Sequence, residues 1–105
     1  MYDLANLKKL KDLGKDAPAA VEAYRAFDKV AMADGAVPKK YKELIAIAVA
    51  LATQCPYCLE AHRKGAEAAG ATQEEIAETA MVAAALRAGA VVTHATHVIG
   101  GEAAK

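Results

Sequence analysis

The sequence predicts an all-α protein, and three observations support this fold class. Alanine, the residue with the highest helix propensity, dominates the 55% of the 105 residues that are hydrophobic. Apolar residues recur three and four positions apart along most of the chain, which is the spacing of one helix face. Glycine or proline punctuates the segments where helices commonly end or begin. We therefore expect five to six helices in a single domain over residues 1–105.

Three of these helices are expected in the first half of the chain, over residues 3–14, 16–35 and 37–54. Gly14 and Gly35 mark the expected ends of the first two helices, and Asp16 is the expected N-cap of the second. Pro38 lies near the first turn of the third helix. The second half of this third helix is apolar on nearly every side, so we expect it to be buried all round.

The second half of the chain contains the segments 55–70, 72–89 and 90–101. Pro56 suits the first helical position, which makes Cys55 the N-cap, and Gly70 suits the residue after the helix end. The next helix opens with a capping box, Thr72–Glu75, and Gly89 would end or kink it. The last segment is rich in β-branched residues, but we expect a helix there because a lone strand would have no partner.

Composition also bears on the protein's surroundings. The charges of thirteen basic and thirteen acidic side chains cancel, and this zero net charge argues against nucleic-acid binding. The first residues contain no apolar signal-peptide region. The longest apolar run, residues 44–52, is too short to span a bilayer, and Arg87 interrupts the next one. We expect a cytoplasmic protein with no membrane partner, where a structural disulfide is not favoured.

The core of a single chain should be thin. Alanine buries little area per residue, the sequence has no tryptophan, and it has one phenylalanine. An alanine-rich domain of this size gains stability when other subunits cover its apolar faces. We therefore expect the chain to oligomerise through helix packing.

The two cysteines lie three positions apart in the stretch TQCPYCLEAHRKG, residues 53–65. Cys55 and Cys58 at a helix start are close enough to form a reversible disulfide, and the helix N-terminus favours the thiolate form. His62 lies four residues after Cys58 and shares its helix face, so its imidazole can take the thiol proton. This asymmetry makes Cys58 the attacking sulfur and Cys55 the resolving one. The opposite assignment stays open, with Cys55 in the more exposed position.

Glu43 is the expected third member of this group. If the helices on either side of residue 54 form an antiparallel hairpin, Glu43 lies opposite roughly residue 65, within a turn of His62. A carboxylate there would orient the imidazole and stabilise its charged form.

Other interpretations of the same residues are a zinc site, with His62, His94 or His97 as further ligands, and a non-catalytic structural module. The zinc spacing would be uncommon, and Leu59 after the second cysteine excludes the C-x-x-C-H haem attachment motif. A general protein-disulfide or dithiol oxidoreductase would use the same cysteines. For His94 and His97 we expect a structural or interface role. The catalytic residues expected are Cys58, Cys55, His62 and Glu43, with no cofactor and no metal.

This pattern resembles the AhpD-like alkylhydroperoxidase branch of the carboxymuconolactone decarboxylase family. The matching residues are Glu43, Cys55-Pro56-Tyr57-Cys58 and His62, in the spacing E-x11-C-x2-C-x3-H, and the similarity covers about residues 37–98. One position departs from the pattern, because some members have a histidine where this chain has Tyr57. The decarboxylase branch lacks the cysteine pair.

The resemblance implies an AhpD-like helical fold that assembles as homo-trimers or homo-hexamers. It implies a thiol-dependent hydroperoxide reductase in which Cys58 attacks the peroxide, Cys55 resolves, and Glu43 and His62 form a proton relay. The implied reductant is a dithiol carrier such as a lipoyl-bearing or thioredoxin-like protein. The apolar wall from Leu44 to Leu51 is expected to keep the site dry and to favour organic peroxides.

Overall fold

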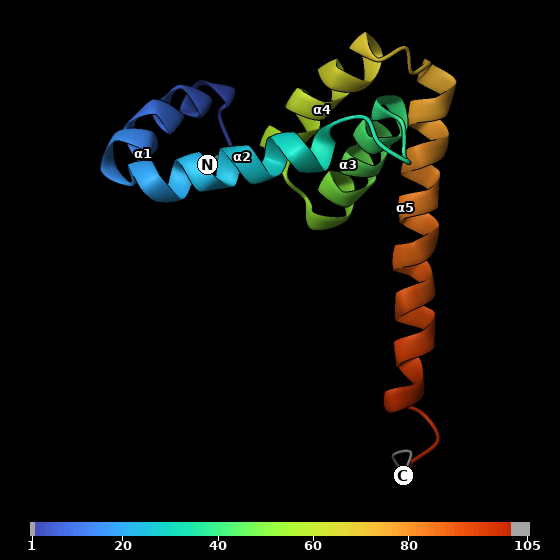
Figure 1. Cartoon of the computed structure of the whole chain (residues 1–105). Coiled ribbons are helices and arrows are strands. Elements are labelled where there is room, and N and C mark those ends of the chain that lie inside the picture. Colours follow the sequence, from blue (N-terminus) through green and yellow to red (C-terminus); the bar gives the residue numbers. More distant parts are fainter. Residues whose placement is uncertain (1, 102–105) are drawn as a thin grey trace.

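The chain folds entirely into helices, with no strand in residues 2–101, the part that the computed structural model describes. The all-α class predicted from the sequence is confirmed. The elements follow one another (Figure 1) as the 3-10 helix η1 Leu4–Lys9, the α-helices α1 Leu10–Asp16, α2 Pro18–Met32, α3 Lys39–Thr53, α4 Pro56–Ala68 and α5 Gln73–His94, and the 3-10 helix η2 Ala95–His97.

Helix α3 is the centre of the fold, because it packs against both α4 and α5. Between α3 and α4 the chain reverses at Gln54, whose backbone is left-handed with φ of 57°. The N–H of Cys55 then donates to the carbonyl of Ala50 at 2.9 Å and closes the turn. Leu44 and Ile47 of α3 pack on Ala66 of α4 to form the buried core. This is the antiparallel hairpin expected from the sequence.

Several predicted helix boundaries are confirmed. Pro56 occupies the first turn of α4 with Cys55 as its N-cap. The capping box that opens α5 is present, since the Thr72 hydroxyl accepts from the Glu75 N–H while the Glu75 carboxylate accepts from the Thr72 N–H. Gly70 follows α4 with φ of +92°, a conformation that favours glycine.

Other boundaries differ from the prediction. Gly14 lies inside α1, and Gly89 lies inside α5, which continues to His94. A glycine inside a helix costs only about 1 kcal/mol relative to alanine, so helix-forming neighbours carry the helix across it. Ala17, and not Asp16, caps α2, which ends at Met32 before Gly35. The first part of the predicted N-terminal helix, Leu4–Lys9, is 3-10 and not α.

The expectation that the second half of α3 is buried all round is wrong for the single chain. Ile45 and Val49 keep more than half of their surface exposed, because α3 has neighbours on only part of its circumference. Among the described residues the buried hydrophobic side chains are few, and they are Leu44, Ile47, Ala50 and Ala66. The single chain therefore has the thin core that its composition predicts.

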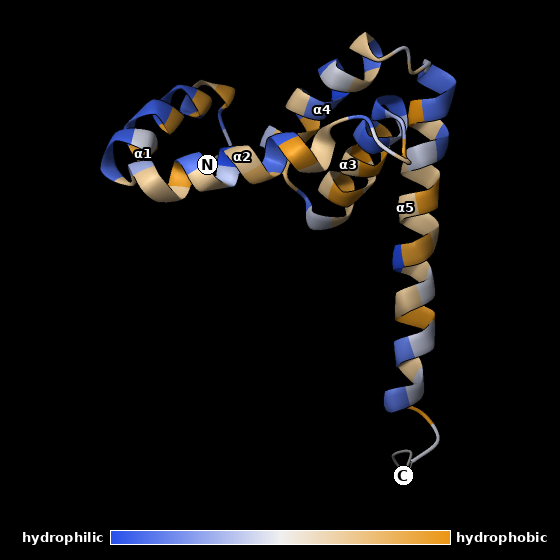
Figure 2. Ribbon diagram, viewed as in Figure 1, coloured by the Kyte–Doolittle hydropathy of each residue, from blue (hydrophilic) through white to orange (hydrophobic). Residues whose placement is uncertain are grey.

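The described chain is much less compact than its length allows. Its radius of gyration is 17.9 Å, whereas a compact domain of this length has about 13 Å. The second half of α5 extends beyond the other helices (Figure 1), and apolar residues continue along it (Figure 2). Its large hydrophobic side chains are exposed, namely Met81, Val82, Leu86, Val91 and Val92.

The stretch Gln73–His97 is long and apolar enough to cross a membrane, by length and composition only. The uninterrupted apolar runs considered in the sequence do not identify this stretch. The reason is that α5 and η2 continue as one helical stretch of 25 residues, longer than the apolar run around Arg87. The core helices of soluble proteins pass the same test.

Candidate active site

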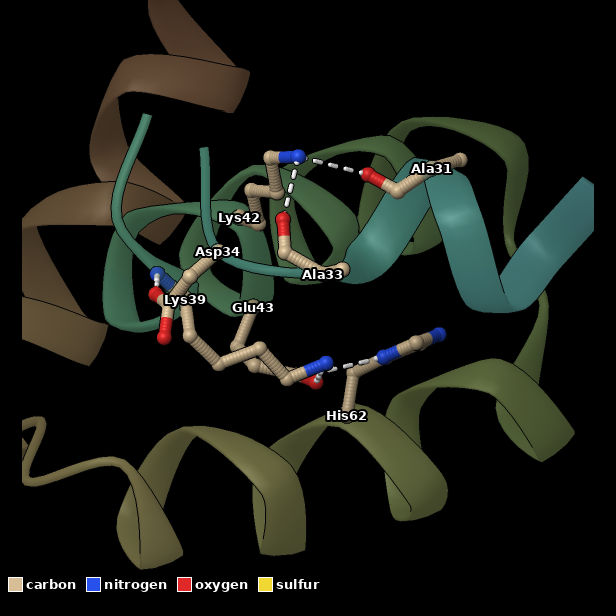
Figure 3. Close-up of polar contacts among 7 residues, drawn as sticks. All are labelled: Ala31, Ala33, Asp34, Lys39, Lys42, Glu43 and His62. Carbon is tan, nitrogen blue, oxygen red and sulfur yellow. Dashed lines mark hydrogen bonds and ion pairs between the residues drawn. The ribbon is translucent and has the colours of Figure 1, made fainter. Parts of the chain in front are cut away.

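Glu43 and His62 meet between α3 and α4 (Figure 3). The Glu43 residue is only 5% exposed, and its Oε2 lies 2.7 Å from Nδ1 of His62. The hairpin geometry expected from the sequence thus brings the two side chains together. The other ring nitrogen of His62 lies on the far side of the imidazole from the carboxylate. Glu43 is therefore placed to fix the ring and stabilise its protonated form.

Two further residues complete the surroundings of this carboxylate, and the sequence reasoning missed both. Lys39 Nζ lies 3.0 Å from the second oxygen of Glu43, Oε1. At Gly65 an added Cβ would lie only 2.6 Å from Glu43 Cδ, so only glycine leaves room for the carboxylate. The available signals were their positions, four residues before Glu43 and three residues after His62.

The Glu43 carboxyl has a net lowered pKa, the outcome of opposing effects. Burial, the largest single contribution, raises the pKa because it disfavours the charged form. Hydrogen bonds from His62 and Lys39, together with their charges, lower the pKa and outweigh burial. Glu43 is therefore a carboxylate at neutral pH, held between the imidazole of His62 and the ammonium of Lys39.

Both cysteines are free thiols at the start of α4, but their exposures differ from the expectation. Cys58 is the exposed one and Cys55 is half-buried, because the turn after α3 draws the Cys55 backbone against Ala50. Cys58 lies one helical turn before His62 on the same face of α4. The cysteine that shares a helix face with His62 is thus the more exposed of the two.

The two thiols perturb one another. The Cys58 side chain hydrogen-bonds to Cys55 and lowers the pKa of Cys55, and the backbone N–H groups of Cys58 and Tyr57 lower it further. The same thiol contact raises the pKa of Cys58, to which burial and the charge of Cys55 add. The contact between the two thiols therefore shifts their pKa values in opposite directions, that of Cys55 down and that of Cys58 up.

Tyr57, which directly precedes Cys58, binds the N-terminal segment. Its hydroxyl oxygen accepts from the N–H of Asp3 at 3.4 Å and from Nδ2 of Asn6 at 3.1 Å. The rings of Tyr2 and Tyr57 meet edge to face with centroids 5.7 Å apart. Where some AhpD-like members have a histidine, this chain thus has a residue that holds its own N-terminal segment to the C-x-x-C motif.

A cavity of about 560 Å³ lies beside the motif, not on the sulfurs. Its walls include Ile47 and Leu51 of α3, which belong to the predicted apolar wall, with Pro56 and Tyr57 of the motif. The residues that line this cavity do not include Cys55, Cys58 or His62. Only part of the predicted apolar wall, Ile47 and Leu51, therefore faces this cavity, on the flank of the candidate site.

The remaining histidines lie elsewhere. His94 ends α5, where its Nδ1 contacts the carbonyl of Ala90 at 2.8 Å, and its ring centroid is 5.7 Å from that of His97. Neither residue contacts Glu43 or His62. Within residues 2–101 no group of three or more His, Cys, Asp or Glu side chains is placed to hold a metal ion. The zinc interpretation thus has no support from the geometry.

Comparison with known proteins gives the family. The sequence profile described as the carboxymuconolactone decarboxylase family matches residues 18–99. The chain belongs to this family. Its members of known structure include a carboxymuconolactone decarboxylase family protein from Legionella pneumophila, which is 36% identical with a TM-score of 0.73 over 76% of this chain and 71% of that one. A protein from Methanobacterium thermoautotrophicum is 31% identical with a TM-score of 0.77, covering 82% of this chain and 97% of that one.

Curated relatives carry no assigned activity. Protein 4 in the cox locus of Paracoccus denitrificans, named as uncharacterized, is 48% identical over 98 residues, which are 90% of this chain and 88% of that protein. An uncharacterized protein of Cupriavidus necator is 41% identical over 66 residues, or 63% of this chain and 58% of that protein. Family membership thus confirms the resemblance seen in the sequence.

Proposed function

We propose that this chain is a thiol-dependent hydroperoxide reductase with Cys58 and Cys55 as its redox pair. The observation that carries the proposal is the 2.7 Å contact between buried Glu43 and His62, on the α4 face that also bears Cys58. An imidazole fixed by a buried carboxylate, one turn from an exposed thiol, is suited to move a proton to and from that thiol.

In the first step His62 takes the proton of the Cys58 thiol, and Glu43 stabilises the imidazolium. The Cys58 thiolate attacks the distal oxygen of the hydroperoxide, an S–O bond forms, and the O–O bond breaks. His62 returns its proton to the departing alkoxide, which leaves as an alcohol. The peroxide is reduced and Cys58 is oxidised to a sulfenic acid.

In the second step the acidic Cys55 attacks the sulfenic sulfur of Cys58. A Cys55–Cys58 disulfide forms, and the hydroxyl of the sulfenic acid leaves as water with the proton of Cys55. An external dithiol then reduces this disulfide in two exchange reactions and becomes a disulfide itself. We propose a lipoyl-bearing or thioredoxin-like protein as this dithiol.

A second candidate function is general dithiol–disulfide exchange without peroxide. The lowered pKa of Cys55 favours it, because an acidic sulfur at a helix N-terminus is the attacking thiol in thioredoxin-like motifs. In this reaction the protein would use Cys55 first and would not need Glu43 or His62 as a proton relay.

Turnover of cumene hydroperoxide and of a small aromatic disulfide, each with dihydrolipoamide as reductant, separates the two functions. We expect His62→Gln to lower peroxide turnover about 10²-fold, in the range of a lost general acid–base group, and to change disulfide turnover little. His94→Gln, outside the site, is the matched control and should change neither. Equal loss of both activities, or faster disulfide than peroxide turnover by the unaltered protein, would favour general exchange.

The exposed apolar faces support a proposal about assembly. We propose that the protein is cytoplasmic and that it forms a homo-trimer or homo-hexamer. In this assembly other copies would cover α5 and the exposed face of α2. That face of α2 presents Tyr24, Phe27 and Val30 with well over half of their surface exposed. A monomer rarely leaves so much large apolar surface uncovered. Burial between subunits would also complete the thin core.

Leu86→Glu on α5 should shift the protein toward monomers in sedimentation analysis and lower its melting temperature, because the charge would be buried between subunits. Lys64→Glu, on the exposed polar face of α4, is the control and should leave the assembly intact. A monomeric unaltered protein would contradict the proposal. Recovery of the unaltered protein only from membranes with detergent would assign the α5 surface to lipid instead.

A further inference from the structure

The buried carboxylate of Glu43 has two partners, the imidazole of His62 and the ammonium of Lys39, but the relay uses only the first. His62 contacts Oε2 of this carboxylate. Lys39 lies one turn earlier in α3, and its Nζ is 3.0 Å from Oε1 (Figure 3). The Lys39 side chain is 41% exposed, so its ammonium reaches from solvent toward a carboxylate that is almost wholly buried. A surface ion pair usually contributes little stability. The position of this pair, at the back of the relay, points to another role.

The other charged groups near this point have partners of their own. Lys40 binds Glu75 at the start of α5, at 2.9 Å. Lys42 donates to the carbonyls of Ala31 and Ala33 at the end of α2. On α4, Arg63 binds Glu60 and Glu67. From the elements packed against it, Glu43 thus receives His62 and Lys39, and the Lys39 backbone is itself anchored by Asp34.

We propose that Lys39 is a positioning residue of the Glu43–His62 relay, which neutralises the carboxylate so that His62 stays unprotonated until Cys58 supplies the proton. The inference rests on the proposed function for its chemical purpose. The geometry gives two effects. The ammonium fixes the rotation of the carboxylate so that Oε2 faces the imidazole, and it supplies the positive charge that a buried anion requires.

Without Lys39 the buried anion would face His62 alone. Its attraction for a proton on the imidazole would then be stronger, because no second cation shares the carboxylate. His62 would take this proton from solvent at a higher pH than in the unaltered protein. An imidazole that already carries this proton cannot accept the proton of Cys58.

The test is an NMR titration of the imidazole C–H signals, which needs no enzymatic activity. We expect Lys39→Met to raise the titration midpoint of His62 by about 0.5–1 pH unit, less than for a fully buried pair because Lys39 is partly exposed. Lys39→Arg should restore most of the original midpoint. Lys40→Met removes a neighbouring lysine whose partner is Glu75, and it should leave the His62 midpoint unchanged. The signals of His94 and His97 serve as internal references.

Two outcomes would overturn the inference. One is an unchanged His62 midpoint in Lys39→Met. The other is an equal shift from Lys39→Met in a Glu43→Gln background, since the effect must pass through the carboxylate. The same experiments distinguish a failure of the proposed function from a failure of this inference. If the midpoint shifts as expected but the protein does not turn over hydroperoxide, the relay geometry stands and the peroxidase assignment is wrong.

Discussion

Cys58→Ser should abolish hydroperoxide turnover, with a loss of at least about 10³-fold. Serine fits the same space at the exposed start of α4, but its hydroxyl does not ionise near neutral pH and cannot attack the peroxide oxygen. The measurement is the rate of cumene hydroperoxide reduction with dihydrolipoamide in excess. Circular dichroism and the melting temperature should stay close to those of the unaltered protein, because the side chain is exposed.

Cys55→Ser is the matched variant, and it should stop the cycle one step later. Cys58 would still attack the peroxide once, but no neighbouring thiol could resolve the product. We expect one equivalent of alcohol and a sulfenic acid on Cys58, detected by mass spectrometry as a gain of one oxygen or as a dimedone adduct. The two serine variants thus separate attack from resolution within one motif.

The pKa order of the pair makes this comparison decisive. The resting structure lowers the pKa of Cys55 and raises that of Cys58, whereas exposure and the position of His62 favour attack by Cys58. A sulfenic acid on Cys55 in the Cys58→Ser protein would show that acidity, and not the relay, selects the nucleophile. The roles of the two cysteines would then be reversed.

The pairing of Glu43 with His62 could be predicted from the sequence because it depends on regular geometry alone. Two helices joined by a tight turn must run antiparallel, and the number of residues on each side of Gln54 fixes which positions face one another. The N-cap position of Cys55 followed from Pro56 by a local rule of the same kind. Predictions that rest on backbone periodicity or on capping therefore describe the hairpin well.

Burial and mutual effects of side chains could not be predicted in this way. Whether Val49 is covered depends on which elements, or which subunits, pack against α3, and periodicity does not give that. The relative exposure of Cys55 and Cys58 depends on how the turn seats the Cys55 backbone on α3. Gly65 has a visible role only once the Glu43 carboxylate is placed against it. Long-range contacts of this kind decide which residues support the site.

Gly65→Ala should disrupt the relay, although none of the relay residues is substituted. The new Cβ would lie 2.6–2.8 Å from the Glu43 carboxylate atoms, and the carboxylate cannot move without losing His62 or Lys39. Overpacking of this kind costs about 1–3 kcal/mol of stability. A displacement of about 1 Å in a catalytic group can cost 10²-fold in rate, so we expect a similar fall in peroxide turnover. Chemical denaturation and steady-state kinetics measure the two effects.

The control is the same substitution at Gly14, which lies inside α1. There the added Cβ would be 3.8 Å from Val21, an ordinary van der Waals distance, so Gly14→Ala should stabilise the protein slightly through helix propensity. Opposite signs for two glycine-to-alanine changes in helices would show that the cost at Gly65 comes from its neighbour and not from the backbone.

Removing the carboxylate identifies that neighbour. In a Glu43→Ala background the obstacle to a Cβ at position 65 is gone, so Gly65→Ala should become neutral or stabilising by up to about 1 kcal/mol. Peroxide turnover should stay low in the double variant because the relay lacks its carboxylate. If instead Gly65→Ala costs the same with and without Glu43, the glycine serves helix packing, and the close approach to the carboxylate is not what position 65 requires.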